Sequence, residues 1–339
     1  MVEHLTFNQG VGSSSLPRPT SKSAGALDCH KITTFSDGFV AYKICAQAEG
    51  KSRRSIDWII DIVGYFNAFL GNLNIEAVTA DDLRRFIIAL QQRQAFANHR
   101  FTKPQNRPLS SESITSYTRA IKTFFSFLER EELIASNPMK RVKLPKALKK
   151  SMPVFNEGDL GKLLAQPDKR SSAGYRNYVI MLTLLDTGIR VTELCNLKTS
   201  DVDLANGYLK VMGKGAKERY VPIGAKLTKV LLKYLMNRGP ERSDVSFFVT
   251  YDGRPLVKKR VQDLIKSYGK KADIKTRCSP HTFRSTSAVL YLRNGGDPFS
   301  LQKKLGHSSL TMTRRYSVIA DSDVKAQHLK YGVVDKLNI

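Results

Sequence analysis

The helical periodicity between about Ser36 and Pro138 is the feature that most constrains the fold. Apolar residues recur there at steps of three and four positions, which places them along one face of an α-helix. An amphipathic helix has to cover its apolar stripe with other elements, so successive stripes predict a helical bundle. The stripes are Phe35, Phe39, Tyr42 and Ala46; Ile56, Ile59, Ile60, Val63, Phe66 and Leu70; Leu83, Phe86, Ile87 and Leu90; and Ile114, Tyr117, Ile121, Phe124, Phe125 and Leu128.

Polar residues indicate where two of these helices begin. Thr79 is followed by Asp82, and this spacing is typical of a capping box, in which each side chain bonds the other residue's backbone N–H. Ser110 or Ser111 is expected to start the last helix, after a polar loop. Residues 31–138 are therefore predicted to form one helical domain.

Two segments outside the bundle lack periodicity. Residues 1–30 are rich in Gly, Ser and Pro and predict a disordered leader. Residues 139–153 contain no acidic residue and predict a basic linker. Such a linker can be merely solvated or can follow the phosphate backbone of a nucleic acid, and the charge of the whole chain favours the second interpretation. Its cations, as candidate DNA contacts, are Lys140, Arg141, Lys143, Lys146, Lys149 and Lys150.

Residues 154–339 begin with two further helical patterns. Asn156 precedes an acidic amphipathic segment and resembles a helix N-cap. Residues 178–185 are apolar on nearly every side, which predicts a buried helix that Gly188 would terminate.

Strand patterns follow in the same domain. Residues 209–212 and 219–222 flank a glycine-containing turn and predict a β-hairpin, and residues 247–249 predict a third strand. The chain is therefore expected to be mainly α, with an N-terminal helical bundle and a C-terminal α+β domain that carries a small antiparallel sheet.

The charge balance points to a polyanionic partner. The 339 residues include 55 Lys and Arg against 30 Asp and Glu, a formal net charge of +25, for which DNA or RNA is the default explanation. The four cysteines form no C-x-x-C pair and no zinc-spaced cluster with His, so neither metal nor other cofactor is expected. Few cysteines, no membrane-length apolar run and no signal peptide indicate a cytoplasmic protein without a membrane partner.

Candidate chemical groups gather near the C-terminus. His281 and Arg284 are three positions apart, so on a helix they share a face, and His307 and Tyr316 follow them. Arginines bind phosphate oxygens, histidines exchange protons and a tyrosine oxygen can attack phosphorus. Taken alone, a tyrosine with apolar neighbours is more often a core residue, but the nearby His281, Arg284 and His307 favour a chemical role for Tyr316.

Further candidates lie upstream. Arg190 follows the predicted end of the buried helix and can bind phosphate, pair with Glu193, or do both, because a carboxylate can orient a phosphate-binding arginine. Lys214 stands between two glycines at the predicted hairpin tip. Lys217 and Arg219 are close by, so the residues alone leave open which cation acts at the site and which contact DNA.

In this order, the motifs resemble those of the tyrosine recombinase family, also called the phage integrases. The resemblance extends over about residues 33–330. Each motif is modest, but the five in the correct order and spacing are specific. They are Thr187 to Leu194, Gly213 to Arg219, His281 to Arg284, Leu305 to Ser309 and Thr311 to Tyr316.

The resemblance implies a role for each residue. Arg190 and Arg284 would clamp the scissile phosphate, with Glu193 supporting Arg190. His307 would add a hydrogen bond, and His281 would assist proton transfer. Lys214 would be the general acid, unless a different hairpin register gives that role to Lys217. Tyr316 would attack phosphorus and form a 3′-phosphotyrosine bond, without a metal ion.

Within the family the chain resembles the two-domain Xer/Cre-like integrases, which implies a SAM-like core-binding bundle and a catalytic domain. Such an enzyme would recombine double-stranded DNA at inverted-repeat core sites, as a homotetramer on paired sites, through a Holliday junction. Accessory DNA-bending or directionality factors are further expected partners. Residues 7–20 resemble peptides read through the 3′ end of a transfer RNA gene, which suggests integration or excision of a mobile element. The alternatives are a relaxing enzyme like type IB topoisomerases and a non-catalytic DNA-binding protein.

Overall fold

The computed structural model describes residues 32–95, 105–145, 152–213, 217–238 and 246–320, together with 328, 329, 332 and 334. The predicted leader, the peptide at residues 7–20, and Lys146, Lys149, Lys150 and Lys214 lie outside these ranges. The chain divides into two compact units, Met1–Lys149 and Lys150–Ile339, and each is described by itself.

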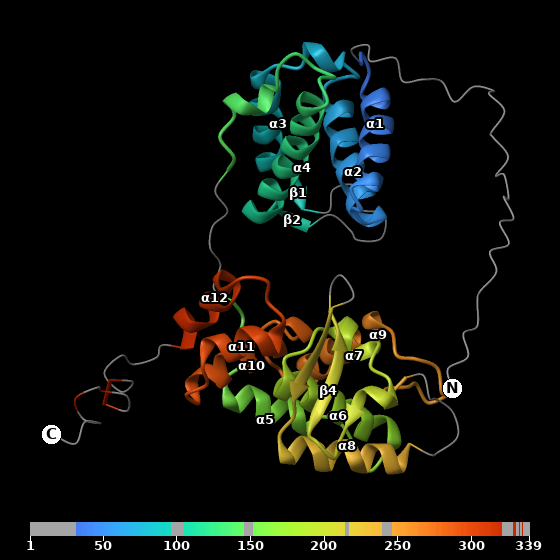
Figure 1. The fold of residues 1–339 in the computed structure, drawn as a ribbon, viewed down its shortest axis with the longest axis vertical. Coiled ribbons are helices and arrows are strands. Elements are labelled where there is room, and N and C mark those ends of the chain that lie inside the picture. Colours follow the sequence, from blue (N-terminus) through green and yellow to red (C-terminus); the bar gives the residue numbers. More distant parts are fainter. Residues whose placement is uncertain are drawn as a thin grey trace, which may run out of the picture. The chain divides into compact units, whose positions relative to one another are not determined.

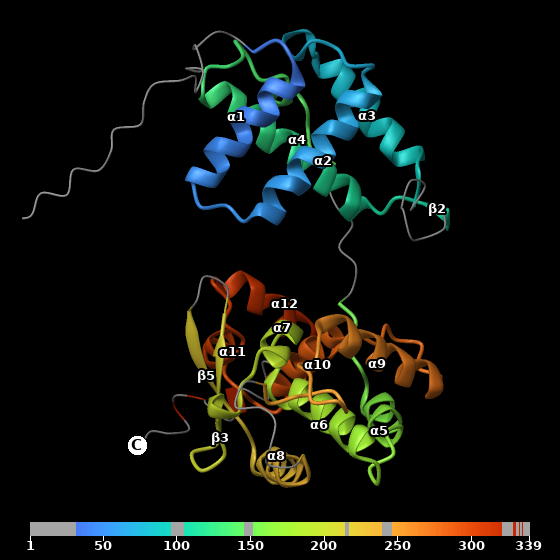
Figure 2. The ribbon, with the colours of Figure 1, turned by 90° about the vertical axis from the view of Figure 1, so that its right-hand side faces the viewer.

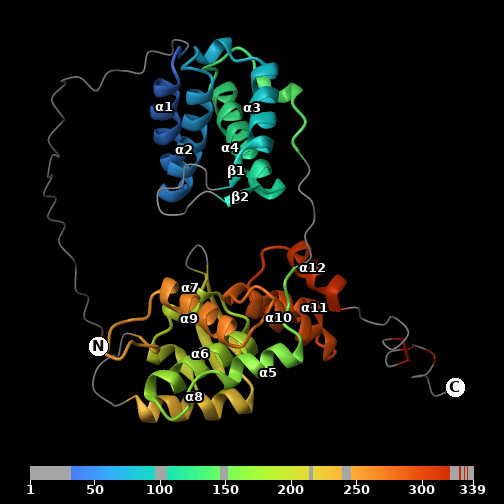
Figure 3. The same ribbon diagram turned by 180° about the vertical axis from the view of Figure 1, so that it is seen from behind.

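The N-terminal unit is a helical bundle, seen from opposite sides in Figure 1 and Figure 3. Its helices are α1 (Phe35–Ala48), α2 (Arg53–Phe69), α3 (Ala80–Gln92) and α4 (Ser111–Arg130), with 3₁₀ turns η1 (Ile75–Ala77) and η2 (Pro138–Arg141). The predicted polar loop before α4 also contains an antiparallel pairing of β1 (Gln94–Ala95) with β2 (Gln105–Pro108), which the sequence pattern did not indicate.

Side-chain caps start all four helices of the bundle. Thr34, Ser52, Thr79 and Ser110 each have an extended backbone, and each accepts a hydrogen bond from an N–H of the first turn. The predicted capping box is confirmed, since Asp82 also accepts from the N–H of Thr79 at 2.8 Å. Of the two serines that could have started the last helix, Ser110 is the N-cap of α4.

Aromatic side chains from all four helices fill the core of the bundle. Phe35, Phe66, Phe86, Phe124 and Phe125 are almost fully buried, and most of their ring pairs are tilted or edge-on, the arrangement that aromatic quadrupoles favour. A Cβ on Gly38 of α1 would lie 2.9 Å from the Phe124 ring, so this glycine lets α1 and α4 approach closely. The predicted stripes thus form the core.

The C-terminal unit surrounds one buried helix with others (Figure 1, Figure 2). Helix α6 (Ser172–Thr187) contacts α5 (Glu157–Ala165), α7 (Val191–Cys195), α8 (Ala225–Asn237) and α10 (Pro280–Arg293). Helix α10 in turn contacts α9 (Lys258–Lys271), α11 (Pro298–Leu305) and α12 (Leu310–Ala320). Asn156 caps α5, as predicted.

A small antiparallel sheet covers part of this unit, with strand order β3 (Val202–Asp203), β4 (Tyr208–Met212), β5 (Glu218–Pro222). The predicted hairpin is confirmed: Lys210 pairs with Tyr220, so Leu209, Val211 and Val221 turn inward. The predicted strand at residues 247–249 is wrong, because only Val249 forms an isolated bridge, to Pro255. Adjacent Phe247 and Phe248 are both fully buried, so these residues lack the face-to-face alternation of a strand.

Two glycines end helices where the backbone is left-handed. Gly188 follows α6 with φ 64°, as predicted, and Gly306 follows α11 with φ 64°. This conformation is nearly free of strain only for glycine, and it leaves the last carbonyl groups of each helix accessible to side-chain donors. Across the described parts of the chain, no helix has the length and apolar character to cross a membrane.

Candidate active site

Arg284 lies one turn into α10 and is only 5% exposed. Its Nη1 donates to the carbonyl oxygen of Gly188 at 2.6 Å, and its Nη2 donates to that of Leu305 at 2.7 Å. Both oxygens belong to helix C-termini, which have no intrahelical donor and carry partial negative charge. Burial, and then the neighbouring Arg190, lower the pKa of Arg284 to about 10, so the guanidinium stays charged at neutral pH.

Arg190 and Glu193 stand at the start of α7. The N–H of Arg190 donates to Glu193 Oε2 at 2.7 Å, and its Nη1 donates to Glu193 Oε1 at 2.8 Å. Burial would raise the pKa of the Glu193 carboxyl, but hydrogen bonds from Arg219 and Arg190 hold that pKa below its ordinary value. Glu193 is therefore an ionised carboxylate that orients Arg190. The ion pair with Glu193 is compatible with phosphate binding by Arg190.

Arg219 points into the protein from β5. Its Nη1 and Nη2 donate to Glu193 Oε1 and Oε2, each at 2.9 Å, and its Nε donates to the Lys304 carbonyl at 3.0 Å. Side-chain exposure is 14%, against 38% for Arg190. These contacts favour an internal role over the predicted contact with DNA.

The last turn of α11 and its cap accept hydrogen bonds from three guanidinium groups. The carbonyl oxygens of Lys304, Leu305 and Gly306 receive donors from Arg219, Arg284 and Arg190, the last at 3.4 Å. One carboxylate, Glu193, offsets only part of this charge. The helix end therefore gathers positive charge in a fixed arrangement, which suits the binding of a phosphate diester and the charge that develops on it.

His307 and Tyr316 complete this cluster. Their rings are stacked at an interplanar angle of 13°, with centroids 5.9 Å apart. His307 Nδ1 lies 3.0 Å from the hydroxyl of Thr313, and both side chains are buried. Burial and the charges of Arg284, Arg190 and Arg219 lower the pKa of His307 to about 4, so the ring is neutral at pH 7.

His281 lies in the first turn of α10, with part of its surface exposed. Partial burial of the ring is the larger cause that lowers the pKa of His281 below its ordinary value, and the charges of Arg284 and Arg277 lower it further. A neutral imidazole at this place can accept a proton, which suits the predicted role.

Lys304 fixes α11 against α6. Its Nζ donates to the carbonyl of Asp186 at 2.8 Å and lies 5.0 Å from the centre of the Tyr291 ring. Sequence reasoning singled out neither Lys304 nor Thr313. Thr313 could have been noticed, because it precedes Tyr316 by one helical turn and so shares its face. Nothing in the sequence marks Lys304.

The other predicted cations that the structure describes are exposed. Lys217 is exposed just before β5, and its carbonyl accepts from the N–H of Gly213 at 2.8 Å, which closes the hairpin. Lys140, Arg141 and Lys143 are exposed at the end of the N-terminal unit, where Lys140 pairs with Glu129 at 2.8 Å.

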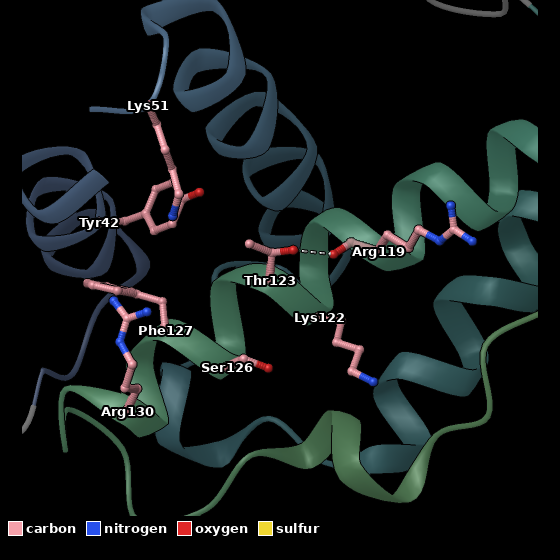
Figure 4. A pocket seen from close by; sticks show the side chains of 8 residues that line it. All are labelled: Tyr42, Lys51, Arg119, Lys122, Thr123, Ser126, Phe127 and Arg130. Atoms are coloured by element: carbon pink, nitrogen blue, oxygen red, sulfur yellow. Dashed lines mark hydrogen bonds between the residues drawn. The ribbon is translucent and has the colours of Figure 1, made fainter. Parts of the chain in front are cut away.

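A basic pocket that the sequence pattern did not indicate opens in the N-terminal unit (Figure 4), with a cavity volume of about 500 Å³. The Tyr42 hydroxyl is buried there without a hydrogen-bond partner in the part of the chain that the structure describes. Lys51 and Arg130 pair with Glu49 at 2.6 and 2.7 Å. The pocket is lined by Tyr42, Lys51, Arg119, Lys122, Thr123, Ser126, Phe127 and Arg130.

Solved structures that share this fold include those of two integrases. The Tn1549 transposon integrase in complex with a circular intermediate DNA has a TM-score of 0.66 and 18% identity, over 84% of this chain and 94% of that one. A lambda integrase tetramer bound to a Holliday junction has the same TM-score and identity, over 84% of this chain and 77% of that one. At this identity the likeness concerns the fold alone.

Sequence comparison is more specific. The model of the phage integrase family matches residues 153–322, which include every described residue of the candidate active site. The tyrosine recombinase XerC of Bacillus pumilus (strain SAFR-032) is 34% identical over 237 residues, or 68% of this chain and 78% of that protein. The chain therefore belongs to the phage integrase family and is a tyrosine recombinase, an enzyme that breaks and rejoins DNA strands.

Proposed function

We propose that this enzyme recombines double-stranded DNA at specific sites, with Tyr316 as the nucleophile. One observation carries the proposal: Arg190, Arg284 and neutral His307 converge on the end of α11, and His307 stacks on Tyr316. A scissile phosphate beside the half-exposed Arg190 would meet two guanidinium groups and an imidazole. These groups supply positive charge and hydrogen bonds to the non-bridging oxygens as negative charge develops there.

We infer the following strand-breaking step. The Tyr316 oxygen forms a bond to phosphorus while the bond from phosphorus to the 5′ oxygen breaks, leaving a 3′-phosphotyrosine. The phenolic proton passes to His281, and the leaving 5′ oxygen takes a proton from Lys214 or Lys217. Attack by a 5′-hydroxyl reverses the step, and no external energy source is needed because the phosphodiester is exchanged for another phosphate ester.

Thr313 would set the tautomer of His307. If its hydroxyl donates to Nδ1, the proton of the neutral ring stays on Nε2, which can then donate to a phosphate oxygen. Tyr316 itself is buried, so substrate binding has to bring its oxygen to the phosphorus.

We further propose that residues 31–138 are the core DNA-binding domain, that residues 139–153 follow the DNA backbone, and that residues 154–339 are the catalytic domain. The net charge of +25 and the basic pocket support DNA contact by the N-terminal unit. Assembly as a tetramer on paired inverted-repeat sites, through a Holliday junction, agrees with the lambda integrase complex that shares the fold. The Tn1549 integrase gives similar support to a role in moving a mobile element, with accessory DNA-bending or directionality factors as further partners.

A nicked suicide substrate carrying the native site tests the nucleophile. The wild-type chain should form an SDS-resistant adduct that maps to Tyr316 by mass spectrometry, and Tyr316→Phe should form none. An adduct in Tyr316→Phe would assign the wrong nucleophile, and no adduct in either protein would favour a non-catalytic DNA-binding protein.

The product tests the reaction. Exchange between two sites through a four-way junction is expected, whereas relaxation of any supercoiled plasmid without pairing of sites would identify a type IB topoisomerase. Cleavage should persist in EDTA, because the arginines supply the charge at the phosphate. Loss of cleavage in EDTA that magnesium restores would overturn this mechanism.

A further inference from the structure

We propose that Arg219 is a positioning residue for DNA cleavage, which holds Glu193 and the end of α11 so that Arg190 faces the phosphate. The proposal rests on the function proposed above. Arg219 sits on β5, whereas Glu193 belongs to α7 and Lys304 to α11, so one guanidinium joins three separate elements.

The carboxylate of Glu193 is saturated by this arrangement. Oε1 accepts from Nη1 of Arg190 and Nη1 of Arg219, while Oε2 accepts from the backbone N–H of Arg190 and Nη2 of Arg219. A planar guanidinium matches both carboxylate oxygens at once, and a lysine ammonium cannot. The paired bonds from Arg219 therefore fix the plane of the Glu193 carboxylate as well as its charge.

Removing Arg219 would change the orientation of the Arg190 guanidinium. Glu193 is buried and ionised, and among the described residues Arg190 would become its only cationic hydrogen-bond partner. The guanidinium of Arg190 would then be drawn further toward the carboxylate, and less of its charge would face a phosphate. The rate of cleavage should fall for this reason, even though Arg219 does not itself touch DNA.

The packing around Gly306 ties the same residue to α11. A Cβ at Gly306 would lie 3.1 Å from Arg219 Nε, so the guanidinium rests directly against the helix cap. His307 follows this cap, and Gln302 holds its backbone through hydrogen bonds of 3.1 and 3.2 Å. Arg219 thus supports both sides of the phosphate site, at Arg190 and at His307.

Single-turnover cleavage at saturating DNA separates this role from direct DNA contact. Arg219→Met should slow formation of the covalent complex by about 100-fold, while the Kd for uncleaved DNA and its salt dependence change by less than about threefold. Arg219→Lys should remain at least about 10-fold slow, because it keeps the charge and loses the paired geometry. Lys210→Met, which breaks a 3.0 Å pair with Glu218 in the same sheet, is the control and should cleave normally.

Combination with Glu193→Gln decides whether the two residues act together. If Arg219 works mainly through Glu193, the double variant should cleave only slightly more slowly than Glu193→Gln alone, by the loss of the contact with α11. The double variant also avoids leaving an unpaired buried charge, so the comparison holds even if Arg219→Met does not fold. Rate losses that multiply, wild-type rates in Arg219→Lys, or a weakened Kd with an unchanged rate would each overturn the proposal. Failure of the wild-type chain to form any adduct would instead refute the proposed function.

Discussion

The titration of His307 should make the stability of the C-terminal unit depend on pH. Its pKa is about 4 in the folded chain, against an ordinary value of 6.5. As pH falls below 6.5, the unfolded chain takes up a proton that the folded chain does not, so the free energy of unfolding falls with pH until about pH 4. Linkage gives a loss of about 1.8 kcal/mol between pH 7 and pH 5 from this residue alone.

His307→Phe isolates this contribution, because it keeps an aromatic ring against Tyr316 and removes the titration. Leaving the Thr313 hydroxyl without its partner lowers the stability of the variant at every pH, so only the slope with pH is compared. Urea unfolding should be followed by circular dichroism at pH 7 and pH 5, with fluorescence of Trp58, the only tryptophan, reporting the N-terminal unit separately. Other groups, His281 included, titrate in both proteins and cancel.

The wild-type chain should lose about 2 kcal/mol more than His307→Phe over this interval. Equal losses, or an NMR titration that places His307 near pH 6.5, would show that the three neighbouring arginines do not depress its pKa as the structure indicates.

Three further changes test other parts of the structure. Gly188→Ala should lower the free energy of unfolding by about 2 kcal/mol, because the backbone there is left-handed and the new Cβ would lie 2.8 Å from Leu305 Cδ2. Gly161→Ala is the control and should not lower it, because a Cβ there would meet no atom within 4 Å. Equal losses in the two variants would contradict the role of Gly188 at the helix end. Thr313→Val should slow single-turnover cleavage about 10-fold without weakening DNA binding, and an unchanged rate would remove its part in orienting His307. Tyr42→Phe should leave the urea stability measured by Trp58 fluorescence unchanged or higher, because the buried hydroxyl has no partner among the described residues. A loss of about 1 kcal/mol or more in stability would reveal a partner in the free protein.

Local sequence patterns predicted much of the fold. Apolar spacing placed the helices of the N-terminal unit, and Thr79, Ser110 and Asn156 marked helix starts, because caps and stripes depend on residues within one or two turns. The hairpin and the helix end at Gly188 were predicted for the same reason. The strand expected at residues 247–249 was wrong, since apolar runs pack equally well in irregular core segments and only the surrounding core decides between them.

The chemistry-bearing residues of the site could be named from the sequence, because Arg, His and Tyr in family order identify the kind of reaction. How they are held could not. Arg219 was expected to contact DNA, and only the folded chain turns its guanidinium to Glu193 and to the end of α11. Carbonyl oxygens of the backbone have no sequence signature, yet those of Gly188, Lys304, Leu305 and Gly306 hold the three arginines. The sequence therefore determined which groups are candidates for the chemistry, and tertiary structure decided where they point, because donors and acceptors far apart in the chain meet only when the helices pack.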